Sequence, residues 1–137
     1  VEAEDRARAY ALTYPDVLRA LHFCLKWSDL STAAQLVKTR ADELDGDHYE
    51  LLTTAADALR ERHPLAATLL WRAMIDFALI EGRASRYGHA ASHLNDCGAV
   101  APEVDTFDAF SSHDRYVVEL RVRHERKSSF WAKFDAH

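Results

Sequence analysis

The chain has 137 residues, of which 48% are hydrophobic and 28% charged, and its formal net charge is −5 at pH 7. This length fits one domain with a substantial core, so we interpret residues 1–137 as a single domain. The acidic balance excludes the strongly basic footprint of a dedicated nucleic-acid-binding domain, and no apolar run approaches the roughly 18 residues that would predict a membrane span.

The first 60 residues predict four helical segments. Residues 2–11 are short and charged, and we interpret them as the frayed end of a helix. A second helix opens at Tyr14, and Ser28 or Ser31 is expected to cap a third. An acidic turn at residues 45–47 separates the third helix from a fourth. Because the chain begins with valine, we expect it to be the C-terminal part of a longer protein.

The segment from Pro64 to Ile80 has the clearest pattern. Proline suits the first position of a helix, and apolar residues then cover most of the helix circumference. Only Thr68, Arg72 and Asp76 interrupt this pattern, and their spacing of four places them on one narrow line. A helix with so small a polar face is expected to be surrounded by other helices. We therefore predict that this segment is the central rod of the fold.

The helix that follows this rod in the chain completes a hairpin with it. Gly82 supplies the flexible backbone that ends the first helix, and the apolar residues between Tyr87 and Cys97 recur on one side of the next. Gly98 is predicted to stop this later helix of the hairpin, and Pro102 keeps it from resuming.

The remaining residues predict a loop and two short helical elements. Residues 99–111 form the longest expected loop, Ser111 starts the next helix, and Ser128 caps a terminal turn. No segment alternates with the period of two that a strand requires. The fold class is therefore predicted to be all-α.

Two arrangements of these helices are open. A shift of 38 residues aligns the apolar positions of residues 49–59 with those of residues 87–97. Helical pairs repeated at such an interval are typical of tetratricopeptide-like arrays. We favour antiparallel helical hairpins stacked as a short tetratricopeptide-like α-solenoid, with a compact helical bundle as the alternative.

A metal site is the first chemical hypothesis. His89 and His93 lie four residues apart on one predicted helix, and His124 is a candidate third ligand. Cys97 cannot join His89 on one ion, because eight helical residues span roughly 12 Å, whereas each metal bond is about 2 Å long. The chain also lacks a phosphate-binding loop and a nucleophile-elbow motif. We predict no metal, no cofactor and no catalytic residue, and keep a metal-dependent enzyme as the weakest alternative.

Charge is segregated along the chain. Residues 113–137 hold six basic and four acidic residues, a net charge of +2, whereas residues 1–112 hold 11 basic and 18 acidic residues, a net charge of −7. Two interpretations follow. The basic C-terminal helix contacts an anionic partner, which includes nucleic acid, or it complements the acidic body of the domain. We favour the second.

The leading functional hypothesis is a non-enzymatic scaffold that presents a surface to a protein or peptide. The two cysteines, Cys24 and Cys97, are expected to be buried reduced thiols, which favours a cytoplasmic location. The residues expected to contact a partner are Arg83, Arg86, His89, Arg121, Arg126, Lys127 and Trp131.

Four short segments carry a family resemblance. They are PLAA at Pro64–Ala67, RY at Arg86 and Tyr87, AASHL at Ala90–Leu94, and HERKSSFW at His124–Trp131. With these, about residues 20–134 resemble the C-terminal region of an uncharacterised, mainly proteobacterial family of helical-repeat proteins, known as a domain of unknown function. The resemblance implies a solenoid-like α-helical fold in a bacterial cytoplasmic protein. It implies no reaction and no ligand.

Overall fold

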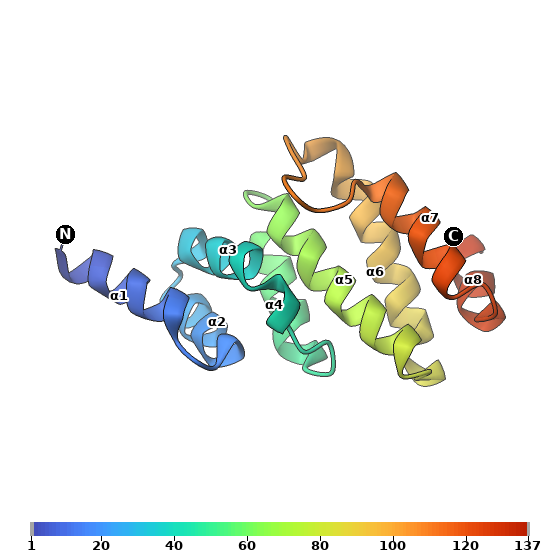
Figure 1. Cartoon of the computed structure of the whole chain (residues 1–137), viewed down its shortest axis with the longest axis horizontal. Helices are drawn as coiled ribbons and strands as arrows, with labels where there is room; N and C mark the ends of the chain where they lie inside the picture. Colours follow the sequence, from blue (N-terminus) through green and yellow to red (C-terminus); the bar gives the residue numbers. More distant parts are fainter. Residues whose placement is uncertain (1, 137) are drawn as a thin grey trace.

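A computed structural model describes residues 2–136, and within this range every regular element is helical (Figure 1). The all-α prediction is confirmed. The α-helices are α1 (Glu2–Thr13), α2 (Val17–Lys26), α3 (Leu30–Thr39), α4 (Tyr49–Leu59), α5 (Pro64–Ile80), α6 (Tyr87–Val100), α7 (His113–Arg123) and α8 (Ser128–Asp135). Three short 3-10 helices connect them, namely η1 (Ala41–Glu43), η2 (Ala84–Arg86) and η3 (Ala101–Glu103).

The helices are stacked along the chain. Helices α4 and α5 pack together and run in opposite directions, as do α5 and α6 (Figure 1). Helices two apart in the chain also pack side by side, because α1 contacts α3, α3 contacts α5, α2 contacts α4, and α6 contacts α8. In Figure 1, α5 and α7 lie toward the viewer, and α4 and α6 lie behind them.

Helix α5 is the buried centre of this stack, as predicted. It packs against α3, α4 and α6, and 12 of its 17 residues are buried. Each fully buried leucine or isoleucine stabilises the fold by about 1.5–3 kcal/mol. The polar line of α5 is enclosed as well, since Thr68 and Arg72 are only 1% and 7% exposed. The ring of Tyr116, from α7, covers this side of the helix.

The N-terminal helices differ from the prediction in where they begin and end. Helix α1 continues as a regular helix beyond the predicted segment, to Thr13. The cap of α3 is Asp29, and not Ser28 or Ser31 as predicted. Its carboxylate accepts hydrogen bonds from the backbone N–H and the hydroxyl of Thr32, at 3.1 and 2.7 Å. A carboxylate can accept both bonds at once, which explains why it caps the helix in place of Ser28 or Ser31.

The C-terminal boundaries also differ. Gly98 does not stop α6, which ends at Val100 and is followed directly by η3, so helical structure extends past the predicted loop start. A side chain at Gly98 would place its Cβ 3.1 Å from the His113 ring, so this glycine permits the close approach of α7. The cap of α7 is Ser112, one residue beyond the predicted Ser111. The predicted terminal turn is helix α8, in which Ser128 is the first helical residue and not the cap.

Gly46 brings the connection between α3 and α4 against the backbone of α5. The residue is buried, and a Cβ built on it would lie 2.5 Å from Phe77 Cβ and still closer to the carbonyl oxygen of Ala73. No side chain fits in this space without a shift of the backbone. The loop is therefore held against α5 by the absence of a side chain.

We expect Gly46→Ala to lower the free energy of unfolding by about 1–3 kcal/mol, because the added methyl overpacks this contact. Gly88→Ala is the matched control. Gly88 is exposed in α6 with no atom within 4 Å of a built Cβ, so alanine should raise stability by about 0.5–1 kcal/mol. Urea titration followed by circular dichroism measures both. Equal stability of Gly46→Ala and the wild type would contradict this account.

Candidate functional site

A groove lies between α4 and α6, with α5 beneath it, and encloses about 580 Å³. We call it the α4–α6 groove. It forms because the apolar face of α4 packs on α5, which leaves the polar face of α4 opposite α6. The residues that line the groove are Gly46, Tyr49, Glu50, Thr53, Thr54, Met74, Ala78, Ser85, Arg86, His89, Ala90 and His93.

The floor of the groove is apolar and its walls are polar. Met74 and Ala78 of α5 supply the floor, and Ala90 continues it onto α6. The small side chains of the two alanines leave the space that a larger residue would fill. On the α4 wall, the Thr53 hydroxyl donates to Met74 Sδ at 3.4 Å. The groove therefore suits a ligand with an apolar group at its centre and polar groups at its edges.

Arg86 is the fixed positive charge of the groove. Its Nη2 lies 2.8 Å from an Asp47 carboxylate oxygen, and its guanidinium lies over the rings of Tyr49 and Phe77, at 4.9 and 5.3 Å. Its Nη1 is buried without a hydrogen-bond partner among the described residues. Two aromatic contacts and one ion pair hold the side chain in place before any ligand arrives.

Two histidines complete the α6 wall. His89 is exposed, whereas His93, one helical turn further, is half-buried. Burial lowers the pKa of His93, and a nearby His89 lowers it further, while Asp96 and Asp57 raise it. A lowered pKa keeps this imidazole neutral at pH 7. This side of the groove therefore carries Arg86 of η2 and the two imidazoles of α6, opposite the Glu50 carboxylate of the α4 wall.

The structure separates the residues of the metal hypothesis. His89 and His93 both line the α4–α6 groove, but His124 follows α7 and does not line it. In residues 2–136, no three histidine, cysteine, aspartate or glutamate side chains gather closely enough to hold an ion. Cys97 is fully buried, its Sγ lies 4.0 Å from the Thr68 carbonyl oxygen, and burial raises its pKa to about 12.

The other predicted partner contacts lie elsewhere. Arg83 lies over the Phe77 ring at 5.7 Å without lining the groove, and Arg126 is exposed. Arg121 pairs with an Asp135 carboxylate at 2.9 Å and stacks on Trp131 at 4.2 Å.

Two of the C-terminal candidates are less accessible than predicted. Trp131 was expected to present an exposed side, but it is only 7% exposed, because it packs edge-on against Phe130 and Phe134. Lys127 is half-buried. In the C-terminal group, the exposed charges at Arg121 and Arg126 are therefore what a partner could contact first.

A buried polar cluster covers the polar line of α5. The Arg72 guanidinium lies 4.3 Å from the centre of the Tyr116 ring and 5.7 Å from that of Phe107. Two of its nitrogens are buried without a hydrogen-bond partner among the described residues. Beside it, the Tyr116 hydroxyl donates to Asp76 at 2.8 Å. Burial lowers the pKa of Arg72 and raises those of Asp76 and Tyr116.

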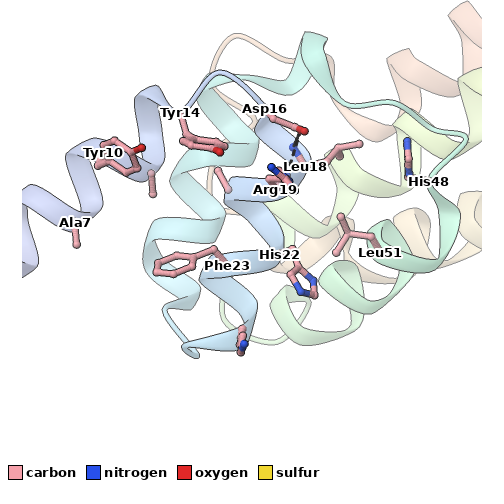
Figure 2. A pocket seen from close by; sticks show the side chains of 13 residues that line it. Ala7, Tyr10, Tyr14, Asp16, Leu18, Arg19, His22, Phe23, His48 and Leu51 are labelled. Carbon is pink, nitrogen blue, oxygen red and sulfur yellow. Dashed lines mark hydrogen bonds between the residues drawn. The ribbon is translucent and has the colours of Figure 1, made fainter.

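A second concave surface lies at the N-terminal end of the stack, where no functional residue was predicted (Figure 2). We call it the N-terminal pocket. It encloses about 890 Å³ and is lined by Ala7, Tyr10, Ala11, Tyr14, Asp16, Leu18, Arg19, Ala20, His22, Phe23, Lys26, His48 and Leu51. Tyr10 and Phe23 are 68% and 52% exposed. The helical period places these rings on outward faces, but only the packing of α1 against α2 groups them.

Comparison with protein families supplies one match, which covers residues 1–133 and is a family of unknown function, DUF6880. The chain belongs to this family. No curated protein and no solved structure matches the sequence. The resemblance to a domain of unknown function is thus confirmed, while the bacterial origin and the helical-repeat character of this DUF6880 chain stay predictions. In the part of the chain that the structure describes, no helix is both long and apolar enough to cross a membrane.

We expect the DUF6880 chain to lose stability as the pH falls below about 6.5, because burial lowers the folded-state pKa values of His93, His113 and His124. Below that pH these histidines bind protons more readily in the unfolded chain than in the folded chain, so protonation favours unfolding. Nearby charges change these shifts: Arg72 lowers the His113 pKa, and Asp114 raises it.

Urea titrations at pH 7.5 and 5.5 measure this effect. A triple variant, with His93→Gln, His113→Gln and His124→Gln, removes the three groups and leaves Asp76, whose raised pKa acts in the opposite direction. The triple variant should therefore lose less stability between the two pH values than the wild type. An equal loss would show that these histidines do not set the pH dependence.

Proposed function

We propose that this DUF6880 chain is a non-enzymatic scaffold that binds a segment of a partner protein in the α4–α6 groove. The observation that carries the proposal is the pairing of an apolar floor at Met74 and Ala78 with a guanidinium, Arg86, that is already held in place at the edge. A partner segment would place an apolar side chain on the floor. A carboxylate beside that side chain would face Arg86 and His89.

The polar groups of the groove support binding and not covalent chemistry. Nucleophilic catalysis needs a hydroxyl or thiol within hydrogen-bond reach of a base. Among the described residues, neither His89 nor His93 forms a hydrogen bond with a groove hydroxyl. The Thr54 hydroxyl instead donates to the backbone carbonyl of Glu50, at 2.9 Å.

The order of helix contacts supports a tetratricopeptide-like arrangement over a bundle, and we include it in the proposal. Alternate helices pack side by side, as shown by α1 with α3, α3 with α5, and α2 with α4. Arrays of helical hairpins are built this way and present grooves between neighbouring helices of one layer. The free, buried thiols of Cys24 and Cys97 support a reducing compartment such as the cytoplasm.

The alternative function, nucleic-acid binding by the C-terminal helix, receives less support from these contacts. Arg121 pairs with Asp135, and Arg115 pairs with Glu119 at 3.1 Å. Both arginines therefore have internal carboxylate partners, as expected where basic residues complement the acidic domain. Nucleic-acid binding would require these pairs to open.

A peptide library displayed on phage tests the proposed function. Peptides enriched on the full chain should bind it in solution, and Ser85→Trp should weaken them about tenfold or more, because the indole fills the groove. Ser92→Trp is the matched control. Ser92 is equally an exposed serine, on α6, but does not line the groove. The proposal fails if no peptide is enriched, or if Ser85→Trp binds as tightly as the control.

A further inference from the structure

The N-terminal pocket is joined to a second cavity, and the two form one continuous surface with aromatic rings. A cavity of about 590 Å³ between α1 and the end of α2 shares Ala7, Ala11 and Phe23 with the N-terminal pocket and adds Trp27. Trp27 is 68% exposed and packs against Phe23, with ring centres 6.0 Å apart.

Helix α1 leaves this surface open, because it packs only along one edge. Of the α1 side chains that the structure describes, Ala11 alone is buried. Figure 2 shows the rings of Tyr10 and Tyr14 on the α1 side of the pocket, with His22 and Leu51 on the other. An apolar surface of this kind, rimmed by polar groups, is typical of a binding site for another protein.

The charged groups around the N-terminal pocket are mostly basic. Arg19 and Lys26 line it, against one carboxylate, that of Asp16. Among the described residues, neither Arg19 nor Lys26 has an ion-pair partner. The one carboxylate in the lining, Asp16, already caps α2 by accepting from two backbone N–H groups at 3.1 and 3.3 Å. The second cavity adds Arg8 and Asp29, which pair with each other at 3.7 Å. Arg19 and Lys26 therefore leave a positive rim on a chain whose net charge is −5.

We infer that the N-terminal pocket docks an amphipathic helix with acidic flanks, supplied by a partner protein. The apolar stripe of such a helix would cover Tyr10, Phe23 and Trp27, and its carboxylates would face Arg19 and Lys26. The concave shape favours a helix over a flat membrane surface, because the lining comes from α1, α2 and α4 and includes the buried Ala11 beside the exposed rings of Tyr10 and Phe23. This site is separate from the α4–α6 groove, and the inference does not depend on the function proposed there.

The test uses three labelled synthetic peptides of about 18 residues, each stapled to hold a helix. The first has leucines at i, i+3, i+4 and i+7 with glutamate flanks, the second replaces glutamate by lysine, and the third is a scrambled acidic sequence. Fluorescence anisotropy measures binding to the full chain. The first peptide alone should bind, and higher salt should weaken it.

Substitutions locate the peptide. Phe23→Ala should weaken binding of the acidic peptide about tenfold, and Lys26→Glu about fivefold. Val118→Ala and Lys38→Glu are the controls and should leave binding unchanged, because neither residue lines the N-terminal pocket or the second cavity, and Val118 is an exposed apolar side chain, at 62%.

Four results would overturn the inference. They are equal binding of the lysine or scrambled peptide, no binding of the acidic peptide, binding of the chain to phosphatidylglycerol vesicles that Phe23→Ala abolishes, and self-association of the chain that Phe23→Ala abolishes. Ser85→Trp should leave binding of the acidic peptide intact, so failure here and failure of the α4–α6 groove are distinguishable.

Discussion

The enclosure of α5 by its neighbours is the constraint that the other helices satisfy. Its apolar residues need cover from α3, α4 and α6, and its polar line needs cover from α7. The same requirement explains Gly46, which lets a connecting loop reach the α5 backbone. Arg72 shows how strong the requirement is. Two of its guanidinium nitrogens are buried without hydrogen-bond partners among the described residues, which is costly, yet the side chain stays enclosed beside the rings of Phe107 and Tyr116.

The central rod could be predicted because its evidence is local. The apolar residues from Pro64 to Ile80 leave no wide polar face, whatever surrounds them. Gly98 shows the limit of such reasoning, since its role depends on the approach of His113 from another helix. Arg86 and His89 were predicted as partner contacts because their side chains were expected to be exposed. Their position over an apolar floor, like the grouping of Tyr10 with Phe23, arises only when distant helices pack together.

Helix α4 separates the two candidate binding surfaces and contributes to both. Tyr49 and Thr53 lie on its side toward α6, whereas Leu51 lies on its side toward α2. A small rotation of α4 would therefore change the width of both surfaces together. Its apolar residues, including Leu52 and Leu59, hold it firmly on α5, which keeps the two surfaces at a fixed spacing.

Because Cys97 is buried, the reaction of its thiol with a reagent reports on motion inside the domain. With a pKa raised to about 12 and no exposed surface, the sulfur is almost entirely protonated and unreachable while α5 and α6 remain together. Thiolate chemistry requires both deprotonation and access. Modification of Cys97 by a thiol reagent therefore requires an opening that exposes this sulfur, either between α5 and α6 or through unfolding of the whole domain.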